Sequence, residues 1–175
     1  YSFVADNYAP FYSLPIECTD RDAGFVLDGL LYNESDLDLE EHYTDTHGYT
    51  EINFAAFAML GKRFCPRIRG VQKQRLYRLN VEREYAALGN LVDRADRTLD
   101  AQVIAQQWDR MGQFYASLER GHTTESVALK RLASCPAKHR ISRANLDLGR
   151  VFTTGCLLSS LSEPQCRQRS SRRSL

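Results

Sequence analysis

The amino-acid sequence predicts an α/β fold that continues into a helical second half, and two observations carry this prediction. Over residues 1–68, β-prone runs alternate with amphipathic helical runs in the order strand, strand, helix, strand, helix, strand. This order is typical of a sheet with helices packed on it. Beyond residue 98, apolar residues recur at the 3.6-residue period of an α-helix.

Two strand candidates open the chain. Tyr1–Ala5 and Phe11–Glu17 are rich in aromatic and aliphatic residues, and the turn-forming residues 7–10 separate them. Pro15 has no backbone N–H to donate, which places the second strand at an edge or a bulge. A helix is predicted next, because residues 19–22 have the composition of an N-cap and the apolar residues after them share one helical face: Ala23, Val26, Leu27, Leu30 and Leu31.

The central part of the chain adds a strand, a helix and a strand. After an acidic connector over residues 33–41, the β-prone run His42–Thr46 ends in a turn that reaches Gly48. Thr50–Leu60 is predicted as a helix with one apolar side, and Gly61 fits its C-terminal end. Arg63–Ile68 is the last strand candidate of this part.

Helices are predicted over most of the second half. Residues 99–118 carry one helical stripe, made of Ile104, Trp108, Met111, Tyr115 and Leu118. Further helical runs cover residues 125–134, 141–148 and 151–161. Residues 165–175 contain four arginines, three serines and little that could be buried, so we expect the tail 164–175 to be disordered.

Acidic and basic residues are separated along the chain. The 175 residues have a formal net charge of +1. Residues 1–61 contain twelve acidic residues and one basic residue, whereas residues 62–175 contain ten acidic and twenty-two basic residues. This asymmetry suggests an acidic site beside a surface that binds a polyanion, although two solvated faces would give the same counts.

The bulk composition excludes several classes of protein. Apolar residues make up 43% of the chain, enough to bury a core, and the length favours one domain or part of a larger one. No apolar run approaches the roughly 20 residues that cross a bilayer, and the N-terminus lacks the basic region of a signal peptide. The five scattered cysteines indicate neither a disulfide framework nor a structural zinc site, so we expect a reducing, cytoplasmic location.

Asp45 is the candidate catalytic and metal-binding residue that the pattern favours. It lies at the predicted C-terminal end of a strand and before a helix, where open α/β sheets collect ligands. A carboxylate there is a natural ligand for Mg²⁺, which takes few protein oxygens. The alternative is that Asp45 only caps the following helix. His42 and His47 flank it, but we favour a surface or hydrogen-bonded imidazole over a transition-metal site for these histidines.

A basic cluster follows the predicted central helix. Alternation along a strand would place Arg63, Arg67 and Arg69 on one side, and Lys62 precedes them. Such a surface is suited to contact the phosphates of nucleic acid. An ordinary solvated face is the alternative for these four residues.

Longer blocks of the sequence resemble one known family. The run VLDGLLYNESDLDLEEHYTDTHGYTEINFAAFAMLGKRFCPRIRG (Val26–Gly70) is similar to the catalytic region of Tn-three family transposases, the replicative enzymes of bacterial transposons. The start, YSFVADNYAPF, resembles the preceding strand of that family, and Leu118–Phe152 resembles its helical insert. The likeness covers nearly the whole chain and weakens over residues 71–98 and in the tail.

The resemblance implies a fold and a mechanism. It implies a partial ribonuclease-H-like core (residues 1–80), an all-helical insert (residues 81–163) and a cytoplasmic bacterial protein that acts on the double-stranded DNA of transposon ends and can oligomerise at full length. The family's Asp-Asp-Glu triad holds two Mg²⁺ ions, which suit phosphoryl transfer. Asp45, in Tyr-Thr-Asp-Thr, matches the second acid of the triad. The first Asp is expected upstream of Tyr1 and the Glu beyond Leu175.

Three hypotheses follow for the chain itself. The first is a segment of an enzyme that cleaves DNA and joins strands. The second is a product that binds DNA without catalysis or interferes with a full-length transposase, and the third is a degenerate gene product. Because a lone Asp45 cannot build a two-metal site, we expect the isolated chain to be inactive.

Overall fold

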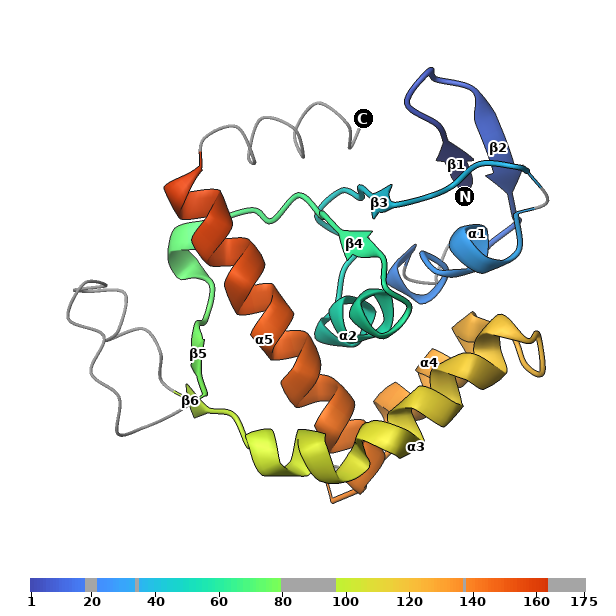
Figure 1. Cartoon of the computed structure of the whole chain (residues 1–175). Helices are drawn as coiled ribbons and strands as arrows, with labels where there is room; N and C mark the ends of the chain where they lie inside the picture. The colour runs from blue at the N-terminus through green and yellow to red at the C-terminus, as the bar shows by residue number, and fades with distance from the viewer. Residues whose placement is uncertain (18–21, 34, 80–96, 137, 164–175) are drawn as a thin grey trace.

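The computed structural model describes residues 1–17, 22–33, 35–79, 97–136 and 138–163 (Figure 1). Its strands are β1 (Ser2–Val4), β2 (Pro10–Ser13), β3 (Glu41–His42), β4 (Arg63–Phe64), β5 (Tyr77–Arg78) and β6 (Arg97–Thr98). Its α-helices are α1 (Asp28–Leu31), α2 (Glu51–Met59), α3 (Ala101–Glu119), α4 (Glu125–Ser134) and α5 (Arg140–Ser162), with short 3₁₀ helices at Asp22–Gly24 and Val71–Lys73. The expected mixture of strands and helices is confirmed. The predicted tail lies outside the described residues.

The strands of the described residues form three separate pairs. β1 and β2 are antiparallel, whereas β3 with β4 and β5 with β6 are parallel. The β1–β2 register shifts at Val4, which lies opposite Pro10, so the irregularity expected for the second strand falls there rather than at Pro15. The continuous sheet that the sequence suggested is not formed by the described part of the chain.

The pairing of β3 with β4 extends beyond the four residues of the two strands. Arg63, Cys65 and Arg67 donate their N–H groups to the carbonyl oxygens of Glu40, His42 and Thr44, at 2.9, 2.8 and 2.8 Å respectively. Donation from alternate residues is the pattern of a parallel ladder. Thr44 is therefore the last residue of the paired segment, and Asp45 follows it directly.

The predicted helix over residues 23–31 is broken in the structure. A 3₁₀ turn over Asp22–Gly24 and the short helix α1 replace it, although its apolar residues are buried or half-buried as expected. Gly29 explains part of this difference. A Cβ on Gly29 would overlap the ring of Phe3, so glycine lets this turn approach β1, and glycine also weakens a helix.

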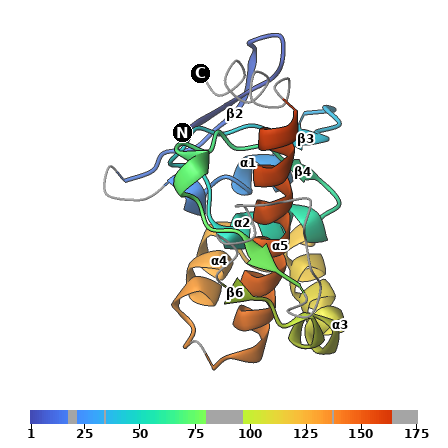
Figure 2. The same cartoon turned by 90° about the vertical axis from the view of Figure 1, so that its left-hand side faces the viewer.

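α2 forms where the sequence predicts a helix, and most of its residues are buried. Thr50 is its N-cap, because the Thr50 hydroxyl accepts a hydrogen bond from the N–H of Asn53 at 3.2 Å. Gly61 follows its C-terminus with a φ of +68°. α2 packs along α5 and beneath β4 (Figures 1 and 2). The main core contains Val26, Leu27, Ile52, Phe54, Phe57, Phe64, Tyr115, Leu118, Leu129 and Leu132.

In the second half, the helices α3, α4 and α5 contain most of the described residues. The short parallel pair of β5 and β6 precedes them. α4 has the predicted bounds, whereas the runs predicted at 141–148 and 151–161 form the single helix α5. The buried face of α3 passes through Gln107, Met111, Tyr115 and Leu118. Trp108 was expected in this face but is 50% exposed, because it lies at the edge of the buried face, about 20° beyond Tyr115 around the helix.

Candidate functional site

The loop between Thr44 and Thr50 presents the Asp45 carboxylate to solvent. Asp45 is exposed, and its Oδ1 accepts hydrogen bonds from the N–H groups of His47 at 2.8 Å and Gly48 at 3.1 Å. These bonds close a turn over Asp45–Gly48 and hold the carboxylate just beyond the end of the β3–β4 ladder. Within the described residues, no hydrogen bond involves Oδ2. The geometry thus leaves one carboxylate oxygen available to a ligand.

Asp45 does not cap the helix that follows it. Thr50 is the N-cap of α2, and the Asp45 carboxylate binds backbone N–H groups of its own turn instead. The structure therefore excludes the capping role that was the alternative for Asp45.

Asn53 ties the Asp45 loop to the N-terminal half. Its side chain is 2% exposed, and its amide Nδ2 donates to the carbonyl oxygens of Ala23 at 2.8 Å and Gly48 at 3.3 Å. Gly48 is tightly enclosed, since a Cβ there would lie 2.7 Å from the Cβ of Thr44. The loop is consequently held from α2 and from its own first residues, which gives Asp45 a defined position.

The phenol of Tyr1 lies in the negative electrostatic field of the carboxylates near this loop. Burial of its side chain, together with the charges of Asp22 and Asp45, raises the pKa of Tyr1 to about 12. Asp22 adjoins Ala23, the residue whose carbonyl Asn53 binds. Two carboxylates thus act on the same phenol, which makes this end of the molecule attractive to cations.

The two histidines that flank Asp45 have different environments. His42 is half-buried, and its Nε2 is buried without a hydrogen-bond partner among the described residues. Its ring stacks on Phe57 and Phe64, with centroids 5.5 and 6.3 Å apart. Burial lowers the pKa of His42 to about 4, so it is neutral at pH 7. His47 is exposed, as expected.

The described residues contain no cluster of three or more His, Cys, Asp or Glu side chains that could hold a metal ion. Asp45 supplies one ligand position with an available oxygen, whereas a two-metal centre needs several carboxylates. The described part of the chain therefore does not form a complete metal site. Cys135 is a free thiol.

Two of the four basic residues expected at a phosphate surface are paired with acids. Lys62 lies 3.3 Å from Asp38, and Arg63 forms an ion pair with Glu41 across the β3–β4 pair. Arg67 is half-buried and Arg69 exposed, and neither makes an ion pair with a described residue. Two acids of the connector over residues 33–41 thus neutralise two of the four basic residues.

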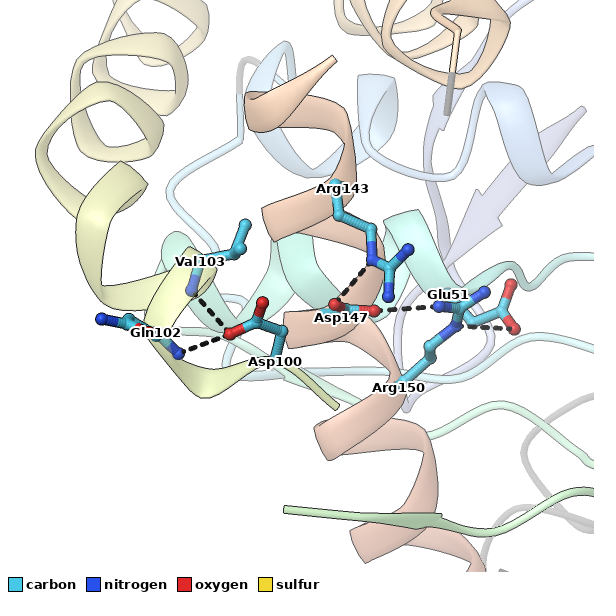
Figure 3. A network of polar contacts seen from close by, with 7 residues as sticks. All are labelled: Glu51, Asp100, Gln102, Val103, Arg143, Asp147 and Arg150. Carbon is cyan, nitrogen blue, oxygen red and sulfur yellow. Dashed lines mark hydrogen bonds and ion pairs between the residues drawn. The ribbon is translucent and has the colours of Figure 1, made fainter. Parts of the chain in front are cut away.

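An ion-pair network centred on the buried Asp147 joins α5 to α2 (Figure 3). The fully buried Asp147 accepts hydrogen bonds from Arg143 at 2.8 Å and from Arg150 at 2.9 Å. Arg150 also lies 4.0 Å from Glu51, at the start of α2, and over the ring of Tyr77. The spacing of Arg143, Asp147 and Arg150 on one helix is a signal that the sequence reading missed.

Asp28 and Glu125 are a second group that the sequence reading missed. Glu125 is fully buried and Asp28 is 6% exposed, where α4 meets the N-terminal segment. Oδ1 of Asp28 accepts a hydrogen bond from the N–H of Ser126 at 3.3 Å. Burial and the neighbouring Asp28 raise the pKa of Glu125 to about 8, so its carboxyl is mainly protonated at pH 7.

Comparison with known proteins identifies the class to which this fold and loop belong. A family model described as the Tn3 transposase DDE domain matches residues 1–174. The domain is thus one of the DDE type, for which a divalent metal ion is implied. The chain belongs to the Tn3 transposase family, as its resemblance predicted.

Individual relatives agree with the family model. The chain is 38% identical to the transposase of transposon Tn2501 from Escherichia coli and to that of transposon Tn501 from Pseudomonas aeruginosa, in each case over 97% of the chain. It is 32% identical to the transposase of transposon gamma-delta from Escherichia coli strain K12. The chain spans 17% of the length of these relatives. No solved structure gives a significant match to it.

None of the helices in the described residues is long and apolar enough to span a membrane. The roles of Asp45, Lys62, Arg63, Arg67 and Arg69 are not tested by the comparisons, and they stay predictions.

Proposed function

We propose that this chain is the part of a replicative DNA transposase that contributes Asp45 to the metal centre for strand cleavage and strand transfer at transposon ends. The observation that carries the proposal is the position of Asp45. Its carboxylate is exposed directly beyond a parallel strand pair, one oxygen is fixed by two backbone N–H groups, and the other is available to a ligand.

The family's chemistry assigns a role to that available oxygen. A bound divalent ion supplies charge stabilisation to phosphoryl transfer, and we infer Mg²⁺, because a hard ion with few protein ligands fits one aspartate oxygen. Further ligands come from other parts of the protein, since the described residues provide no second carboxylate in a metal-binding group. What this chain does itself is to hold Asp45 in position through the turn bonds and the Asn53 amide.

The double-stranded DNA substrate is contacted, in this proposal, by the basic residues that follow α2. Arg67 and Arg69 are the stronger candidates, because no ion pair with a described residue occupies them. Lys62 and Arg63 must exchange Asp38 and Glu41 for phosphates, which reduces their net contribution.

The fold and organisation assigned to the whole protein belong to the same proposal. We infer a ribonuclease-H-like core that includes residues 1–80, a helical insert over residues 81–163, and a bacterial cytoplasmic enzyme that can oligomerise at full length. The parallel β3–β4 pair with α2 packed against it supports such a core, and the three long helices α3, α4 and α5 support the insert.

A second candidate function is DNA binding without catalysis by the isolated chain, including interference with a full-length transposase. The observation that favours it is the single available carboxylate. A chain with one metal ligand and free arginines is expected to bind duplex DNA without cleaving it.

The experiment that tests the proposal uses a full-length transposase containing this segment, Mg²⁺ and duplex DNA with a transposon end. Asp45→Asn keeps the two turn hydrogen bonds through its amide oxygen but removes the charge, so strand cleavage should fall at least about 10³-fold. Asp38→Asn is the matched control, because Asp38 is an exposed acid that pairs with Lys62, and cleavage should stay within about 3-fold. Cleavage at the normal rate by Asp45→Asn would refute the assigned role.

A further inference from the structure

The connection between α4 and α5 lies within a longer stretch of the chain that contains no acidic residue. Residues 126–146 include five Lys or Arg residues and one His, but no Asp or Glu. Arg131 lies in the last turns of α4, Lys138 in the connection, and Arg140 at the start of α5. All three side chains are exposed. We call these three residues the basic corner.

The two helix ends that carry the basic corner are held together. The hydroxyl of Ser142, in the first turn of α5, donates to the carbonyl oxygen of Leu132 near the end of α4 at 2.9 Å. Ser142 is 3% exposed and Leu132 is part of the main core, so this junction is rigid. In both views the corner lies at the end of the molecule remote from β1 and β2 (Figures 1 and 2).

The charges of the basic corner are not neutralised within the described residues. Arg131, Lys138 and Arg140 make no ion pair there, whereas Lys62 and Arg63 are paired with acids. Three exposed cations that repel one another and lack internal partners raise the local positive potential. Lys138 and Arg140 also stand beside the positive end of the α5 dipole, an arrangement that opposes helix stability. An external anionic partner would offset both effects.

The basic corner and the start of α2, which follows the Asp45 loop, are both positioned by α5. Gly149 of α5 abuts the carbonyl of Glu51, the first residue of α2. Arg140 precedes Gly149 by nine residues, which is about 14 Å along the α5 axis.

We infer that the basic corner binds the phosphate backbone of duplex DNA at a contact separate from the phosphate at Asp45. The placement relative to Asp45 rests on the proposed function, whereas binding of duplex DNA by the corner does not. A duplex is the expected partner, because its phosphate charge per unit length is twice that of one strand. The contacts are to the backbone, so binding is independent of base sequence.

The test measures binding of the purified chain to a short fluorescent duplex of arbitrary sequence, between about 50 and 200 mM salt. The variant R131Q/R140Q removes two cations from the corner, and R110Q/R120Q removes two exposed cations from α3 and its C-cap. We expect the first variant to weaken binding about 10-fold and to reduce the slope of log K against log salt by about 2. The matched control should change affinity by less than about 3-fold.

Three outcomes would overturn the inference. Equal weakening by both double variants would mean that affinity follows net charge alone. Unchanged affinity in R131Q/R140Q would place the contacts elsewhere, and tighter binding of a single strand than of the duplex would assign a different partner. Circular dichroism of each variant checks that the helices are intact. A negative result in this binding test does not change the expected cleavage defect of Asp45→Asn. The two experiments therefore test the two proposals independently.

Discussion

Gly149 of α5 lies directly against the backbone carbonyl of Glu51 in α2. A Cβ at position 149 would overlap that oxygen, so the two helix backbones meet without a side chain between them. Glu51 is the first residue of α2 and follows the N-cap Thr50. The contact therefore positions the N-terminal end of α2 against α5, and with it the Asp45 loop that leads into the helix.

Replacement of Gly149 by alanine should separate α2 from α5. The added methyl group has no room, and we expect Gly149→Ala to lower the free energy of unfolding by about 1–3 kcal/mol. Urea denaturation followed by circular dichroism measures this change. Gly155→Ala, on the same helix, is the matched control, because a Cβ at 155 meets no atom within 4 Å. It should stabilise the protein by about 0.5–1 kcal/mol, and equal losses in both variants would contradict the packing argument.

The burial of His42 should make the protein less stable in acid. The folded state holds His42 neutral down to a pKa of about 4, whereas the unfolded chain binds the proton near its ordinary value of 6.5. The free energy of unfolding therefore falls as the pH is lowered from about 6.5 to about 4. By about pH 5 the loss should be about 2 kcal/mol.

His42→Phe isolates this effect, because it keeps an aromatic ring beside Phe57 and Phe64 and removes the titrating group. The difference in unfolding free energy between neutral and acidic solution should shrink in this variant. The exposed His47 is the control, and His47→Asn should titrate like the unmodified chain. An unchanged acid response in His42→Phe would show that His42 is protonated normally in the folded state.

The titration of Glu125 should change the free energy of unfolding with pH in the direction opposite to that of His42. Its pKa of about 8 in the folded state is raised above its ordinary value of 4.5, so the folded state retains a proton that the unfolded chain releases. The free energy of unfolding should accordingly fall as the pH rises from about 4.5 to about 8. Glu125→Gln lacks this titration and should melt at a higher temperature than the unmodified chain at about pH 8.

Glu119→Gln is the matched control for Glu125, because Glu119 is exposed at the end of α3. Thermal melts of the three proteins across this pH range provide the comparison. If Glu125→Gln followed the same pH curve as the unmodified chain, the carboxyl would not be held protonated beside Asp28.

Loss of the Asn53 amide should loosen the Asp45 loop. Asn53→Asp has the same shape but cannot donate to the carbonyl oxygens of Ala23 and Gly48, and we expect a loss of about 2–3 kcal/mol in unfolding free energy. Amide hydrogen exchange at His47 and Gly48 should become faster, because these N–H groups bind Asp45 in the same loop.

Asn33→Asp provides a comparison in which an amide donor is lost elsewhere. Asn33 donates to the carbonyl oxygens of Gly29 and Leu30 at the end of α1. Its replacement should cost stability without faster exchange at His47 and Gly48. The same exchange rates in both variants would show that Asn53 does not position the loop.

The local features of this protein were predictable because neighbouring residues determine them. Thr50 caps α2 with its own hydroxyl, and Gly61 ends the helix with a positive φ, so both boundaries depend on a few consecutive residues. α4 likewise has its predicted bounds. Asp45 was singled out by its place between a strand and a helix, and the hydrogen bond from Arg67 to Thr44 puts it directly after the paired segment.

The sequence by itself thus determined the mixed helix-and-strand content, the family and the candidate carboxylate. Only the tertiary structure decided that Nε2 of His42 is buried, that Lys62 pairs with Asp38, that Glu125 meets Asp28, and that Gly149 touches Glu51. The partners in the three pairs are between 24 and 98 residues apart in the chain. Their proximity depends on how whole helices and strands pack, and no local spacing encodes that packing.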